Sequence, residues 1–239
     1  MKKYFSLVMM LVLCALTLSA CGPKDAIMIA PHDLNMPDTY QIKYTFVVDA
    51  ADDSSDEFAT IVCGCDAAGN YYYSYTSENT VEKRLCIGSD DSYNQYSFNQ
   101  ETGKYELVQE GCRWVTAFVF CNEYVEYAND IVTDRVNGDK KTYEKIEALS
   151  ELPSGVSGAA IDFSDPERFE YFVVKGRVYE GGAGFEGFET VVEKETGACV
   201  YVKFFGFDNH IGGADTECYI YATEYLTPYS GSYGNYLTN

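Results

Sequence analysis

Apolar and polar residues alternate through most of the chain after Thr39, and this period of two predicts β-strands with one buried face. Short β-branched and aromatic runs recur about every ten residues. Turns rich in Asn, Asp and Gly, such as residues 66–70 and 99–103, separate these runs. The inward positions of the first two runs are Ile42, Tyr44, Phe46, Val48, Ala59, Ile61, Cys63 and Cys65. The pattern predicts an antiparallel meander and gives no support to a parallel α/β fold.

The same pattern continues to the end of the domain. Residues 195–197 read Glu-Thr-Gly and predict a tight turn between two late strands. The remaining predicted strands cover residues 71–75, 81–87, 93–98, 104–108, 171–179, 188–194, 200–207 and 218–226.

Two stretches break the period of two. Apolar residues spaced by four and three predict a helix over about 112–134, with an apolar stripe wide enough to lie in the concavity of the sheet. Residues 139–152 favour a second helix ended by Pro153, although Asn137-Gly138 also suits a hairpin turn. The expected fold class is therefore β-rich α+β, with an antiparallel sheet curved into an open half-barrel around one or two helices. The stripe consists of Trp114, Phe118, Cys121, Val125, Ala128 and Val132.

The first 20 residues have the layout of an export signal. Lys2 and Lys3 precede an apolar stretch over 7–18, and Leu-Ser-Ala-Cys-Gly ends it at Cys21. This ending resembles the lipobox of bacterial lipoproteins. The resemblance implies cleavage before Cys21, a diacylglycerol on its thiol, and often an acyl chain such as palmitate on its amino group. Two acyl chains give stable anchoring.

These features divide the chain into four parts. We expect a signal peptide at 1–20, a lipidated Cys and tether at 21–38, a single β-rich domain at 39–228 and a flexible tail at 229–239. The predicted location is the bacterial cell membrane, on its extracytoplasmic face.

Composition limits the possible partners. Hydrophobic residues make up 46% of the chain and aromatics 15%, which excludes collagen-like and wholly disordered classes. Of 17 basic residues, Lys2 and Lys3 belong to the signal, so the mature chain has 15 against 37 acidic ones, formally −22. Such a surface repels nucleic acid. The membrane is therefore expected to be reached through the lipid anchor.

The predicted domain resembles the LolA/LolB-type lipoprotein-carrier superfamily. The resemblance rests on strands interrupted by a helix, on the late hairpin at 192–203, and on the paired runs at 69–72 and 96–105. It covers about residues 40–226. It implies a concave apolar surface that receives acyl chains or a protein partner, and it identifies no functional residue by position.

Groups for catalysis or metal binding are scarce. His32 falls in the predicted tether and His210 in a polar turn, while Gly181-Gly182-Ala183-Gly184 lacks the residues of a phosphate loop. The acidic residues within 49–57 could hold calcium, but a solvated turn explains them better. We expect no enzyme, no cofactor and no metal.

Seven cysteines remain in the mature domain, an odd number, so at least one lacks an internal partner. Cys63 and Cys65 lie on one side of a strand and cannot bridge each other. Small buried residues explain them better than a Cys-x-Cys redox or metal site. We therefore expect several free thiols.

Three functional hypotheses remain. The favoured one is a non-enzymatic lipoprotein that binds an apolar ligand or envelope protein in the half-barrel. A surface adhesin or glycan-binding module using exposed tyrosines is the alternative, because the chain contains 22 of them. An exported hydrolase, which needs facing carboxylates, is the third. The candidate ligand-binding residues are Tyr71, Tyr73, Tyr75, Trp114 and Phe118.

Overall fold

The computed structural model describes residues 35–49, 57–89, 92–112, 142–153, 155–156, 159–180, 183–206 and 217–238. These residues form eleven antiparallel strands and one short 3-10 helix, η1 (Tyr233–Leu237). The strands are β1 (Tyr40–Asp49), β2 (Glu57–Cys65), β3 (Tyr71–Ser77), β4 (Val81–Ser89), β5 (Ser92–Asn99), β6 (Lys104–Cys112), β7 (Thr142–Ile146), β8 (Phe169–Glu180), β9 (Ala183–Glu193), β10 (Cys199–Phe205) and β11 (Glu217–Leu226).

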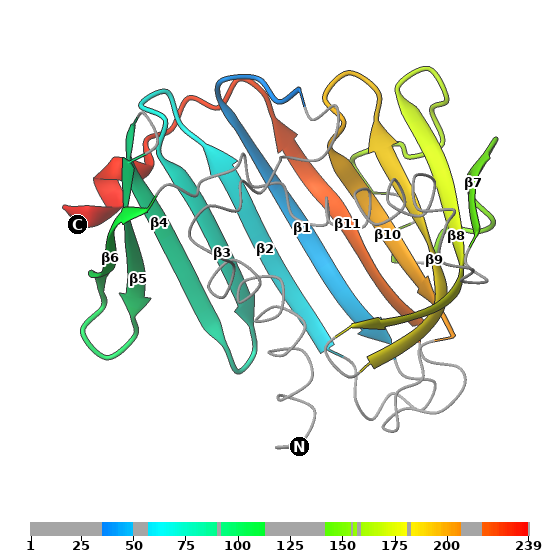
Figure 1. The fold of residues 1–239 in the computed structure, drawn as a ribbon, viewed down its shortest axis with the longest axis horizontal. Coiled ribbons are helices and arrows are strands. Elements are labelled where there is room, and N and C mark those ends of the chain that lie inside the picture. The colour runs from blue at the N-terminus through cyan, green and yellow to red at the C-terminus, as the bar shows by residue number, and fades with distance from the viewer. Residues whose placement is uncertain are drawn as a thin grey trace.

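All eleven strands belong to one sheet with the order β6-β5-β4-β3-β2-β1-β11-β10-β9-β8-β7. Two meanders therefore meet at β1 and β11, which lie side by side in the middle of the sheet (Figure 1). β6 and β7 are the two edges, so the sheet is open. This confirms the predicted antiparallel meander and its open form.

Side chains divide into two faces because neighbours along a strand point to opposite sides of the sheet. We name the faces after one residue each, the Tyr44 face and the Tyr72 face. The register places Tyr44 beside Ile61 of β2 and Ala222 of β11. The inward positions predicted for the first two runs all lie buried on the Tyr44 face.

Two segments that the structure describes cover the Tyr72 face. The connection between β7 and β8 places the Phe163 ring against Phe169 and Tyr201, with ring centroids 6.1 and 5.8 Å apart. At the other half of the sheet, residues 227–238, here named the C-terminal segment, stack Tyr233 on Tyr72 with centroids 5.1 Å apart. Each half of this face therefore has its own cover.

The prediction of a helix over 139–152 is wrong, because residues 142–146 form β7. This strand pairs antiparallel with the outer edge of β8, from Thr142 beside Lys175 to Ile146 beside Tyr171. The Lys145 Nζ lies 2.7 Å from Glu170 Oε1 on β8. The free edge of β8 supplies backbone partners that a helix could not use, and this tertiary pairing overrides the local pattern.

The expected flexible tail also differs from the structure. Tyr233 is fully buried, its N–H donates to Asp66 Oδ2 at 2.7 Å, and its hydroxyl donates to Gln41 Oε1 at 3.2 Å. Gly64 permits this packing, since a Cβ there would meet the Tyr233 hydroxyl and the backbone oxygen of Tyr40. A polar tail is thus held by a non-local site that composition does not reveal.

Several other predicted features lie outside the described residues. They are the signal peptide with Cys21, residues 113–134 of the predicted helix, the calcium candidates Asp52, Asp53 and Asp56, His32 and His210. Of the remaining positions of these predictions, Asp49 ends β1, Glu57 begins β2 and Cys112 ends β6. Within the described part of the chain, no helix has the length and apolar character needed to cross a bilayer.

Candidate functional site

The Tyr44 face presents an almost unbroken apolar surface across the centre of the sheet. β1 and β2 supply the predicted inward residues, and β3 adds Tyr73 and Tyr75. The other half adds Ile220 of β11 and Phe188 of β9, which are aligned with Phe46 and Val174 respectively. Other buried residues of this half include Val174, Val202, Phe204, Cys218 and Ala222.

Within the residues described, no second sheet or helix layer lies across this face. Strands contact their neighbours in the sheet, and η1 contacts β6 on the opposite side. The Tyr44 face thus differs from the Tyr72 face, whose two halves each have a described cover. The side chains at its centre are nonetheless out of water, since Ile42, Ile61 and Ala222 are 0–1% exposed, so this face belongs to the apolar core of the fold.

The structure brings together the three predicted tyrosines of β3. Tyr71, Tyr73 and Tyr75 all project from the Tyr44 face, aligned with Cys65, Cys63 and Ile61 of β2. Tyr73 and Tyr75 are buried, whereas Tyr71 is half-buried and contacts the Tyr93 ring edge-on at 5.8 Å. They therefore line the face rather than form an outward platform. Trp114 and Phe118 lie outside the described residues.

Burial determines the protonation of these phenols. It raises the pKa of Tyr73 well above the ordinary tyrosine value, and Glu82 nearby adds to the shift. It also raises the pKa of Tyr71, with a further contribution from Cys65. Both rings are therefore neutral at physiological pH and suit an apolar ligand better than a charged one.

All six described cysteines lie on the Tyr44 face: Cys63, Cys65, Cys86, Cys112, Cys199 and Cys218. Cys65, Cys86 and Cys112 are free thiols. Burial, with a smaller contribution from Cys112, raises the pKa of Cys86 to about 11, and burial also raises the pKa of Cys65 and Cys112.

Thiols with raised pKa are poor nucleophiles at neutral pH, because the thiolate is the reactive form. No group of three or more His, Cys, Asp or Glu side chains in the described residues could hold a metal ion. The cysteines therefore act chemically as small apolar residues of the lining. Strand parity revealed that Cys63 and Cys65 share a face, but the alignment of cysteines from five strands depends on register.

Hydrogen bonds join several polar groups on this face. The Tyr44 hydroxyl donates to the Cys199 carbonyl at 2.8 Å, which joins β1 to β10 across β11. Thr190 Oγ1 lies 3.2 Å from Cys199 Sγ, and both are buried. Towards the β4 side, Arg84 and Glu82 form an ion pair of 2.8 Å. Charge thus lies at the side of the face, and the centre stays neutral.

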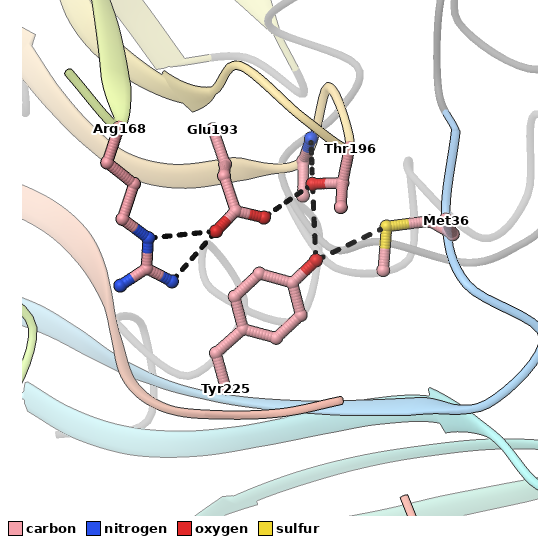
Figure 2. A network of polar contacts seen from close by, with 6 residues as sticks. Met36, Arg168, Glu193, Thr196 and Tyr225 are labelled. Carbon is pink, nitrogen blue, oxygen red and sulfur yellow. Dashed lines mark hydrogen bonds and ion pairs between the residues drawn. The ribbon is translucent and has the colours of Figure 1, made fainter. Parts of the chain in front are cut away.

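A polar network closes one end of the face, where β1 begins and β11 ends (Figure 2). The Arg168 Nε and Nη2 donate to Glu193 Oε1 at 2.9 and 2.8 Å, and Thr196 Oγ1 donates to Glu193 Oε2 at 2.7 Å. The Tyr225 hydroxyl donates to Thr196 Oγ1 at 3.2 Å and lies 3.7 Å from Met36 Sδ. The network therefore connects the hairpin predicted at 192–203 to Met36, near the end of the predicted tether.

Comparison with known proteins gives structural neighbours but no family. No protein-family model and no curated protein matches the chain. A chain of the Pseudomonas aeruginosa MucA/MucB complex matches with a TM-score of 0.36 and 12% identity over 82% of this chain and 54% of that one. This protein thus spans about half the length of that chain.

Two further structures match over nearly their full lengths. A LolA superfamily protein from Nitrosomonas europaea has a TM-score of 0.29 and 11% identity, covering 85% of this chain and 92% of that one. A putative outer membrane lipoprotein-sorting protein domain from Vibrio parahaemolyticus has 0.30 and 8%, covering 95% and 96%. The structural neighbours of this chain thus include LolA superfamily proteins, and the likeness concerns the fold alone.

Proposed function

We propose that this protein is a membrane-anchored, extracytoplasmic lipoprotein that holds an apolar ligand or an envelope protein on the Tyr44 face, without catalysing a reaction. The observation that carries the proposal is the extent of this neutral apolar face, which runs across the sheet from β3 to β9. The predicted lipobox at Cys21 supports the membrane anchor and its location.

The chemistry of the lining supports binding rather than catalysis. Its phenols and thiols are neutral at physiological pH, and the Glu82–Arg84 pair lies to one side. A ligand at the centre would meet aliphatic chains, neutral rings and thiols. These groups favour acyl chains or the apolar side chains of a partner over charged substrates.

The predicted helix over 112–134 fits the same proposal. Cys112 ends one edge strand and Thr142 begins the other, so this stretch connects opposite edges of the sheet. We expect its stripe, with Trp114 and Phe118, to share the Tyr44 face with the ligand.

Thermal unfolding with palmitate tests the proposal on the mature chain, residues 21–239. A ligand at a hundredfold excess over its Kd stabilises a folded protein by about 2.7 kcal/mol, which raises Tm by roughly 5–10 °C for a domain of this size. Absence of any shift with palmitate or an apolar dye would remove the acyl-ligand form of the proposal.

A matched pair of variants locates the binding face. Tyr71 and Tyr96 are both half-buried tyrosines, but Tyr71 projects from the Tyr44 face and Tyr96 from the Tyr72 face. We expect Tyr71→Ser to weaken palmitate binding about tenfold or more, because burying an aromatic ring contributes roughly 1.5–3 kcal/mol. Tyr96→Ser should leave the affinity unchanged. Equal losses in both variants would argue against the Tyr44 face.

A further inference from the structure

Exposed apolar side chains recur along the C-terminal segment and at the residue before it. The described chain exposes six large hydrophobic residues, and three of them lie between 226 and 237: Leu226 at 38%, Tyr236 at 39% and Leu237 at 37%. An apolar composition alone does not decide which of these side chains are exposed, since Tyr233 in the same segment is fully buried. The segment therefore buries one ring and presents other apolar groups to its surroundings.

Hydrogen bonds fix this segment at one end of the sheet. The Tyr229 N–H donates to Thr39 Oγ1 at 3.2 Å, immediately before β1, and the Tyr233 N–H donates to Asp66 Oδ2 at 2.7 Å, immediately after β2. The Tyr236 ring contacts Tyr72 and Tyr105, at centroid distances of 5.2 and 6.3 Å. Figure 1 shows the segment in red at the end of the sheet where β1 begins.

The N-terminal tether reaches the domain at the same end. The Asn35 N–H donates to the Thr196 carbonyl at 2.8 Å, and Met36 contacts Tyr225 in the network of Figure 2. Thirteen residues separate Asn35 from Cys21, so the anchor lies at most about 50 Å from this end. The opposite end of β1 is about 30 Å farther along the strand. A bilayer contact at this end therefore needs the shortest reach of the tether.

We propose that Tyr236 and Leu237 rest in the headgroup region of the bilayer that carries the Cys21 anchor. The inference rests on the lipid anchor of the proposed function and adds a second contact to it. An amphipathic tyrosine ring beside a leucine suits the interface between headgroups and acyl chains. The mature chain is formally −22, so the contact favours zwitterionic over anionic lipid.

Tryptophan quenching by brominated lipid tests the contact on the full lipidated chain in phosphatidylcholine vesicles. Tyr236→Trp places a reporter in the C-terminal segment. The matched control is Phe58→Trp, because Phe58 is 60% exposed and lies near the opposite end of β2. Trp114 is the only natural tryptophan, so the wild-type signal is subtracted from both variants.

We expect the reporter at position 236 to lose roughly half of its emission, since interfacial groups lie about 5–10 Å deep in the headgroup boundary. The reporter at position 58 should keep its emission. Replacing part of the lipid by phosphatidylglycerol should reduce the quenching at 236. Equal quenching at both positions, or none at 236, overturns the inference.

Sedimentation of the same vesicles separates the two proposals. If the chain stays in the supernatant, the lipid anchor itself is wrong. If the chain sediments and position 236 is not quenched, the anchor stands and the interfacial contact is wrong.

Discussion

Replacing Tyr233 by alanine tests whether the C-terminal segment belongs to the folded domain. The ring is fully buried and stacks on Tyr72 and Tyr229 at centroid distances of 5.1 and 5.0 Å, with interplanar angles of 23° and 20°. Aromatic side chains bury about 150–250 Å², which at about 25 cal/mol per Å² corresponds to roughly 4–6 kcal/mol as an upper bound. Measured truncations of buried aromatics cost about 3–5 kcal/mol, and we expect a loss in this range.

Urea denaturation followed by far-UV circular dichroism measures this loss as a lower midpoint with an unchanged slope. Two companion variants divide the effect. Tyr233→Phe removes only the hydroxyl bond to Gln41 and should cost about 0.5–1.5 kcal/mol. Tyr236→Ala removes a partly exposed ring and should cost less than Tyr233→Ala. A Tyr233→Ala protein as stable as wild type would show that the tail is frayed, as its composition suggests, and would refute the packing argument.

Two further predictions concern the anchor and the thiols. Cys21→Ser should abolish fatty-acid labelling and leave the precursor uncleaved or off the membrane, whereas normal labelling of this variant would contradict the lipobox. Because the folded pKa of Cys86 is raised to about 11 from an ordinary 9.0, its contribution to stability is complete below about pH 9 and is lost as pH rises from 9 to 11. Denaturation midpoints of wild type and Cys86→Ala between pH 8 and 11 should converge as pH rises, and parallel curves would contradict the shift.

Alternation along single strands allowed much of the sheet to be predicted. In β1 and β2 every second residue is apolar, and these positions lie on the Tyr44 face, because a strand with one buried face leaves that period in its sequence. Turn chemistry located the hairpin between β9 and β10 in the same way. These signals are local, so they can be read from the sequence without knowing which strands are neighbours.

The features that could not be predicted depend on contacts between distant residues. Tyr143, Ile146 and Leu149 are spaced for a helix, and β7 forms only because the edge of β8 offers a partner. Tyr233 is buried because Gly64, far away in the sequence, leaves room for its hydroxyl. The gathering of cysteines on the Tyr44 face likewise follows from the registers of several strand pairs. The pairing register between distant strands cannot be read from a single sequence.

The junction of β1 and β11 has a consequence for how the chain acquires its structure. The two strands at the centre of the sheet come from opposite ends of the sequence, and the edges come from its middle. The Thr223 hydroxyl on β11 donates to the Lys43 carbonyl on β1 at 3.2 Å across 180 residues. Closing a loop of that length costs roughly 4–5 kcal/mol of chain entropy. During synthesis from the N-terminus, one edge of β1 therefore stays unpaired until the last strand emerges, and the centre of the sheet is the last part to be completed.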